Sequence, residues 1–112
     1  MAKGEFLGEF ELFVMLALAQ LGEEAYGITI RQEIERRTGR DVAIGAVYAT
    51  LSRLEEKALV RHELSAPLPI QGGRARKHFT LTPAGERALA HTTTMLARMM
   101  QGWRPRAQPR ST

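Results

Sequence analysis

The sequence predicts a mostly α (α+β) fold, namely a winged helix-turn-helix with a long C-terminal dimerisation helix. Two short amphipathic helices follow each other across a tight turn, two short extended segments flank a connection rich in Pro and Gly, and a capped final helix carries a heptad seam. A chain of 112 residues builds one compact core rather than two. We therefore expect a winged helix-turn-helix unit with its N-terminal helix in residues 1–81, a dimerisation helix in 82–103, and a disordered basic tail in 104–112.

The first predicted helix is apolar nearly all round and ends at Gly22. In a domain this small the chain itself buries one face of such a helix, so the second face needs a partner subunit to cover it. The helix therefore predicts a homodimer. One face carries Phe10, Phe13, Val14, Ala17 and Leu21, and the other carries Leu12, Met15, Leu16 and Ala19.

The next two helices are predicted at about 26–37 and 44–57, and Thr38-Gly39 marks the end of the earlier one. The later helix has a narrow apolar stripe, and its opposite face is small, polar or aromatic at the front and charged towards the end. Such a face enters a DNA groove without steric obstruction. The stripe consists of Val47, Leu51, Leu54 and Ala58. The candidate DNA-contact residues are Gly45, Tyr48, Ala49, Ser52 and Arg53.

Two extended segments are predicted at about 60–64 and 77–81, because apolar and polar residues alternate in the second. The connection SAPLPIQGGRA between them is typical of a hairpin with a long basic tip, which is the form of a wing. Basic side chains at such a tip straddle the minor groove and neutralise phosphates, unless the tip is merely solvated. The candidate wing contacts are Arg74, Arg76 and Lys77.

The final helix begins with Thr82 as its cap and Pro83 at its first position, where a missing N–H costs nothing. Five residues along it follow a heptad spacing suited to a partner helix: Leu89, Thr92, Leu96, Met99 and Trp103. The candidate dimerisation residues of the chain are Phe13, Leu16, Leu89, Leu96, Met99 and Trp103.

Three residues of this helix, Met95, Met99 and Trp103, fit a second role. Flexible Met side chains and flat aromatic rings line pockets for apolar or aromatic molecules, so a small effector between subunits is an alternative to plain packing. Core or dimer packing is the commoner use of such residues. The sequence leaves both uses open.

Three segments of the sequence match a known family pattern. They are AYGITIRQEIERRTG in the second helix, GAVYATLSRLEEKALV in the third, and GGRARKHFTLTPAG, which spans the second strand and the start of the last helix. Together they cover about residues 25–85 and resemble the PadR-like regulators, in the short subfamily with a single C-terminal helix. The resemblance implies a bacterial repressor that binds double-stranded DNA, dimerises through its first and last helices, and has a DNA affinity open to control by a small molecule.

Two residues depart from that family pattern. Ala58 stands between the third helix and the first strand, where relatives usually have Gly, and we expect little effect on function. Ala43 stands at the start of the third helix, where relatives often place a Ser, Thr or Asn that caps the helix. The cap and its phosphate contact are therefore not expected here.

The charge distribution favours a polyanionic partner. The formal net charge is +4, yet residues 1–30 hold one Lys and five Glu, whereas residues 31–112 hold fifteen basic and seven acidic side chains. A basic surface downstream of the first helix fits nucleic acid better than anionic lipid. A winged-helix module for protein–protein assembly, without sequence-specific DNA binding, is the alternative function.

Several other classes lack support in the sequence. There is no Cys, and the three His do not stand at metal-ligand spacing, so we expect neither a disulfide nor a metal or other cofactor. Nucleophile elbows, phosphate loops and paired catalytic carboxylates are missing, so we do not expect an enzyme. The longest apolar run, 12–19, is too short to cross a bilayer, and we expect a cytoplasmic location.

Overall fold

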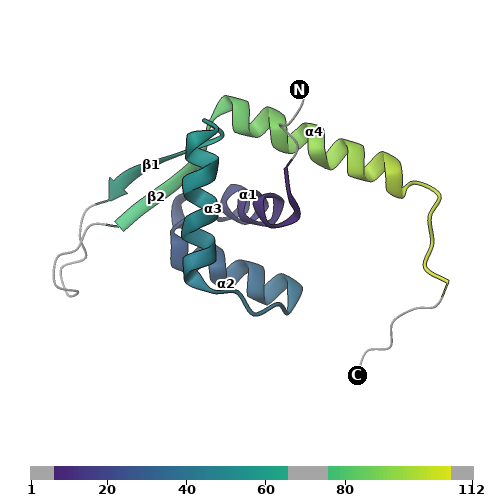
Figure 1. Ribbon diagram of the computed structural model, residues 1–112, viewed down its shortest axis with the longest axis horizontal. Coiled ribbons are helices and arrows are strands. Elements are labelled where there is room, and N and C mark those ends of the chain that lie inside the picture. The colour runs from purple at the N-terminus through teal and green to yellow at the C-terminus, as the bar shows by residue number, and fades with distance from the viewer. Residues whose placement is uncertain (1–6, 66–75, 107–112) are drawn as a thin grey trace.

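The computed structural model describes residues 7–65 and 76–106. In Figure 1, α3 crosses the middle of the molecule, the β1–β2 hairpin projects to one side, and α4 extends away from the body towards the other. The elements are α1 (Glu9–Leu21), the short 3-10 turn η1 (Gly22–Glu24), α2 (Gly27–Thr38), α3 (Ile44–Glu56), β1 (Val60–Ser65), β2 (Arg76–Leu81) and α4 (Pro83–Met100). The predicted winged helix-turn-helix with a long C-terminal helix is confirmed.

The core lies where α1, α2 and α3 meet the base of the hairpin. The largest fully buried side chains come from all of these elements, which agrees with their apolar periodicity. They are Phe79, Met15, Ile30, Leu51, Leu54, Val14 and Val47. Both faces of α1 contribute, because Met15 is completely buried as well as Val14. The body of the chain therefore covers more of α1 than the sequence predicted.

The end of α3 differs from the prediction at Ala58. This residue is exposed rather than part of the buried stripe, and its φ of 61° lies in the left-handed region. Ala58 N donates to the Glu55 carbonyl and Leu59 N donates to the Leu54 carbonyl, both at 2.9 Å. These two bonds form a Schellman ending, in which Gly is the usual residue at the left-handed position.

The strands pair antiparallel, from Val60 opposite Leu81 to Ser65 opposite Arg76. Phe79 points into the core, as its alternation with polar residues predicts. Phe79 N donates to the Ala25 carbonyl at 2.9 Å, so β2 is also bonded to the segment before α2. The predicted wing tip, with Arg74 among its residues, lies outside the described residues.

The start of α4 is fixed to the end of α3. Thr82 caps the helix as predicted, because its Oγ1 accepts from Gly85 N at 3.0 Å. The same hydroxyl donates to the Ala58 carbonyl at 2.7 Å. Gly85 is buried against the Leu59 backbone, so closely that a Cβ on Gly85 would overlap the Leu59 carbonyl.

The far end of α4 is shorter than the heptad pattern predicted. The helix ends at Met100, Gln101 has extended backbone, and Gly102 has a φ of 86°. Trp103 follows this break and is therefore not on the helical seam, although its N–H still donates to the Met100 carbonyl at 3.0 Å. A glycine in the left-handed region ends a helix regardless of the apolar spacing around it. Of the predicted tail, residues 107–112 lie outside the described residues.

Among the helices of 7–65 and 76–106, none combines the length and the apolar character that a membrane crossing requires.

Candidate nucleic-acid interface

The outward face of α3 is open to solvent. Its inward stripe of Val47, Leu51 and Leu54 is buried, which turns the opposite face away from the body. All five predicted contact residues lie on that exposed face: Gly45, Tyr48, Ala49, Ser52 and Arg53. Small side chains at the front of the helix leave room for the edges of bases or for a phosphate backbone.

Tyr48 does not extend freely from this face. It is 43% exposed, and its ring lies against Gly27, the first residue of α2. The hydroxyl of Tyr48 is thereby held at the N-terminal end of α2. Ala43, which precedes α3, makes no side-chain cap hydrogen bond to the first turn.

Arg53 lies towards the end of α3 and is held from within the helix. Its Nη2 donates to Thr50 Oγ1 at 3.1 Å. One turn further on, Lys57 Nζ is 2.9 Å from Glu11 Oε2, which joins the end of α3 to the start of α1. Burial by itself raises the pKa of Glu11, but hydrogen bonds from Lys57 and Gly8 and the charges of Lys57 and Arg53 outweigh it. The pKa of Glu11 is therefore lowered.

The wing strand contributes two exposed cations to the candidate interface. Arg76 and Lys77 open β2, and both are exposed. The guanidinium carbon of Arg76 lies 4.1 Å from the centroid of the Tyr26 ring, a cation–π contact. Lys77 faces Leu64 across the hairpin. These two residues stand where the chain leaves the part of the wing that is not described.

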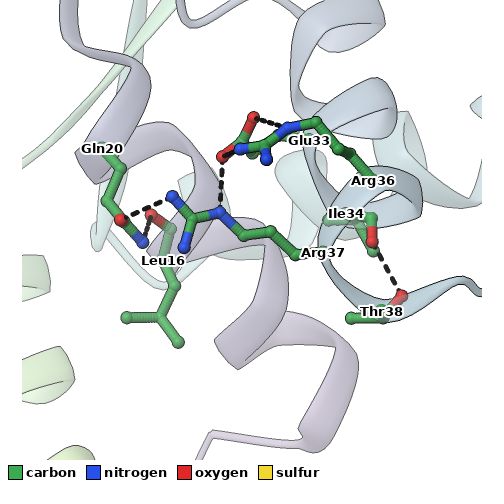
Figure 2. A network of polar contacts seen from close by, with 7 residues as sticks. All are labelled: Leu16, Gln20, Glu33, Ile34, Arg36, Arg37 and Thr38. Carbon is green, nitrogen blue, oxygen red and sulfur yellow. Dashed lines mark hydrogen bonds and ion pairs between the residues drawn. The ribbon is translucent and has the colours of Figure 1, made fainter. Parts of the chain in front are cut away.

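The arginines at the end of α2 are engaged in a local network (Figure 2). Glu33 accepts from Arg36 Nη2 at 2.7 Å and from Arg37 Nε at 2.5 Å, and Arg37 also donates to Gln20 Oε1 at 2.9 Å. The hydrogen bonds from Arg37 and Arg36 lower the pKa of Glu33. Because Gln20 belongs to α1, this network links α2 to α1 and gives these arginines a structural use apart from DNA.

The outer half of α4 carries an uncovered apolar surface. Leu96 is 44% exposed, Met99 80% and Trp103 62%. A shallow groove of about 300 Å³ lies beside Leu96 and Met99 and is lined by Leu7, Thr92, Met95, Leu96 and Met99. The other predicted dimerisation residues, Phe13, Leu16 and Leu89, are half-buried, and Phe13 is covered on one side by Arg40.

The structure brings together some of the predicted residues and separates others. The groove on α4 joins Met95 with Met99, whereas Trp103 is not among its lining residues. The DNA candidates on α3 and β2 are connected through Tyr26 and Gly27, which the sequence did not single out. The sequence feature that could have identified them is an aromatic residue directly before a Gly at the start of a helix. Within the described residues, no three potential metal ligands gather at one place.

Comparison with known proteins supports the resemblance. The model of the transcriptional regulator PadR-like family matches residues 15–91. The chain is 39% identical over 66 residues to the transcriptional regulator Rv3488 of Mycobacterium tuberculosis, which covers 59% of this chain and 57% of that protein. It is 34% identical over 86 residues to an uncharacterized 37.1 kDa protein in transposon TN4556 of Streptomyces fradiae, covering 76% of this chain and 23% of that protein. The chain thus spans less than two thirds of the length of these curated relatives.

Among solved structures, the chain is similar to a PadR-like transcription factor from Bacteroides fragilis. The TM-score is 0.64 at 27% sequence identity, and the superposition covers 80% of this chain and 82% of that one. The similarity thus extends over most of both chains.

Proposed function

Because the chain belongs to the PadR-like family of transcriptional regulators, we propose that it binds double-stranded DNA as a homodimer and represses transcription from a pseudo-palindromic operator. In this proposal α3 enters the major groove, and the wing that begins at Arg76 and Lys77 contacts the neighbouring backbone. Two symmetric subunits then read half-sites about one helical turn apart.

The exposed face of α3 carries this proposal. A helix with one stripe buried and the opposite face open, small at its start and cationic towards its end, has the shape and charge to enter a groove. Tyr48 and Ser52 would act as hydroxyl donors and Arg53 as a phosphate ligand. Gly45 and Ala49 would allow close approach. Direct base readout is sparse in this set, so DNA shape adds to selectivity.

Dimerisation is proposed through α1 and α4. The supporting observation is the apolar surface of Leu96, Met99 and Trp103, which lies in water in the single chain. Leu96 and Met99 line one groove, and contiguous exposed apolar surface of this kind marks interaction sites. The other predicted dimerisation residues, Leu89, Phe13 and Leu16, are half-buried in the single chain.

A small apolar or aromatic effector is the finer part of the proposal. The groove on α4 has the chemistry for it, since Met95 and Met99 line its wall beside Leu96. A second subunit over the same surface would close the groove into a pocket. Trp103 would contribute from the partner-facing end rather than from the groove itself.

The test is a fluorescence-anisotropy titration of the purified protein against an operator duplex and a scrambled duplex at several salt concentrations. If Arg53, Arg74 and Arg76 of both subunits neutralise phosphates, log affinity falls with log salt at a slope of roughly −5. Replacing Arg74 by Ala makes that slope shallower. An unchanged affinity and slope would contradict the wing assignment, and an absence of DNA binding at low salt would favour the protein-interaction module.

A further inference from the structure

We propose that the adjacent residues Tyr26 and Gly27 form a seat that positions the DNA-contact side chains Tyr48 and Arg76. The inference rests on the proposed DNA-binding function and deepens it. Tyr26 and Gly27 act in it as positioning residues, because each holds another side chain. The seat lies at the start of α2, between the recognition helix and the wing strand.

Gly27 is the part of the seat against which the Tyr48 ring packs. A Cβ built on this buried glycine would lie 2.6 Å from Tyr48 Cε1 and still closer to Cζ and the hydroxyl oxygen. Ordinary Cβ atoms do not approach other heavy atoms so closely. Gly27 is not among the glycines with positive φ, so space rather than backbone conformation requires it. The ring of Tyr48 rests on α2 only because Gly27 has no side chain.

Tyr26 provides the second part of the seat. The 4.1 Å separation of the Arg76 guanidinium carbon from its ring centroid is well inside the range of a cation–π contact. The imidazole of His78 meets the same ring edge-on, with centroids 5.5 Å apart. The first residue of the wing strand is therefore stacked on the residue that precedes α2.

The backbone around the seat is fixed on both sides. Tyr26 N donates to Thr29 Oγ1 at 2.9 Å, and Tyr26 itself forms a β-bridge with His78. The ring of His78 lies with Nε2 2.8 Å from the Gly22 carbonyl, so this nitrogen carries the proton. The seat is therefore bonded to both α2 and β2.

The seat fixes the recognition helix and the wing strand relative to each other. Because Tyr48 and Arg76 rest on consecutive residues, the major-groove helix and the wing strand keep one register relative to each other. Preorganisation of this kind lowers the ordering cost of binding. Loss of either contact would loosen a DNA-contact side chain and leave the core unchanged.

The experiment first selects a duplex from random DNA with the wild-type protein and then measures anisotropy with variants. Gly27→Ala displaces the Tyr48 ring and is expected to weaken binding about tenfold, or about 1.4 kcal/mol. Tyr48→Ala has a similar effect. The double variant binds no more weakly than Tyr48→Ala alone, because no ring remains to be displaced. Gly8→Ala is the matched control, since the nearest atom to its added methyl is 3.9 Å away.

A merely structural role for Gly27 gives a different pattern. The substitution would then lower the urea midpoint and weaken DNA binding equally with Tyr48 present or absent, and this result would overturn the seat. Weaker DNA binding by the double variant than by Tyr48→Ala alone would also overturn the seat. Wild-type protein that selects no sequence overturns the proposed function and the seat with it, whereas selective wild-type binding with an unaffected Gly27→Ala overturns the seat alone.

The Tyr26 contact has its own rescue test. Tyr26→Phe keeps the ring and is expected to bind like wild type, whereas Tyr26→Leu weakens binding about fivefold. In an Arg76→Gln background the Phe and Leu variants bind alike, because the cation that they distinguish is gone. Equal binding of the two variants with Arg76 present would overturn this half of the seat.

Discussion

The body of the molecule and the outer half of α4 differ in how completely their apolar surfaces are covered. The body, residues 7–65 and 76–92, fully buries large side chains such as Phe79 and Met15. The α4 arm, residues 93–103, leaves Met99 and Trp103 largely in water. Figure 1 shows this arm running away from the other helices.

The two halves of α4 have different surroundings. The first turns of α4 bury Gly85, Ala88 and Thr92 and belong to the core. The later turns keep the same apolar spacing, but Leu96 and Met99 remain 44% and 80% exposed although Leu7 lines the groove beside them. In the proposed dimer, the body accounts for folding within one chain and the arm accounts for association between subunits. Substitutions that separate stability from assembly test this division.

The largest effect is expected in the anchored part of α4. Gly85→Ala places a methyl group on the Leu59 carbonyl, a backbone atom that cannot rotate away. The start of α4 would have to move off the hairpin, at a cost of about 3 kcal/mol or more. Urea denaturation of the variant measures this loss.

The matched control for that variant is Gly45→Ala. No atom lies within 4 Å of a Cβ at Gly45, which is in the first turn of α3. The same substitution there is expected to keep stability or raise it by up to about 1 kcal/mol, as Ala does in helices. Equal losses in both variants would show that α4 is not anchored through Gly85.

Substitutions of two neighbouring methionines test the role of the arm in dimerisation. Met99 lines the groove with Leu96 on the expected dimer face, whereas Met100 borders the other side of the helix with Ala97. Met99→Lys puts a charge into the interface twice per dimer and is expected to weaken dimerisation by about 2 to 3 kcal/mol. Met100→Lys serves as the control. Sedimentation velocity measures both, and stronger disruption by Met100→Lys would move the interface to the other face.

The sequence predicted the body well because the signals for it are local. The stripe of Val47, Leu51 and Leu54 and the cap at Thr82 depend on residues within one or two turns. The exposed face of α3, the proposed DNA-contact face, follows from the same periodicity, because it is the side opposite the stripe.

Other features depend on residues that are far apart in the chain. The contact of Gly27 with Tyr48 and the pair of Glu11 with Lys57 arise only when three helices pack together. The apolar spacing also predicted a last helix that is longer than the one observed. It placed Trp103 on the seam, although Gly102 turns into the left-handed region before it.

A smaller effect is expected at Glu11, which is 8% exposed and bonded to Lys57. Its pKa is lowered in the folded state, so the unfolded state binds the proton more tightly. The stabilisation is present above the ordinary value of 4.5 and is lost as the pH falls through the folded pKa. Glu11→Gln is expected to cost about 1 to 2 kcal/mol at pH 7 and to flatten this acid dependence.

Glu9→Gln is the control on the same helix. Glu9 pairs with Arg40 at 2.9 Å, but both side chains are exposed, and such pairs contribute less than about 1 kcal/mol. Urea midpoints at pH 7 and pH ~3 compare the variants. An acid dependence that survives in Glu11→Gln would assign it to other carboxylates of the body.

The smallest effect is expected at the Schellman ending of α3. Ala58 holds a φ of 61°, which strains any residue with a Cβ, and Gly removes the strain while adding freedom to the unfolded chain. Ala58→Gly is therefore expected to raise the free energy of unfolding by about 0.5 to 1 kcal/mol and to leave dimerisation unchanged. Ala46→Gly, in the first turn of α3, should lower it by about as much. If both changes destabilise, the left-handed ending is not a source of strain, and the body gains nothing from a glycine at this position.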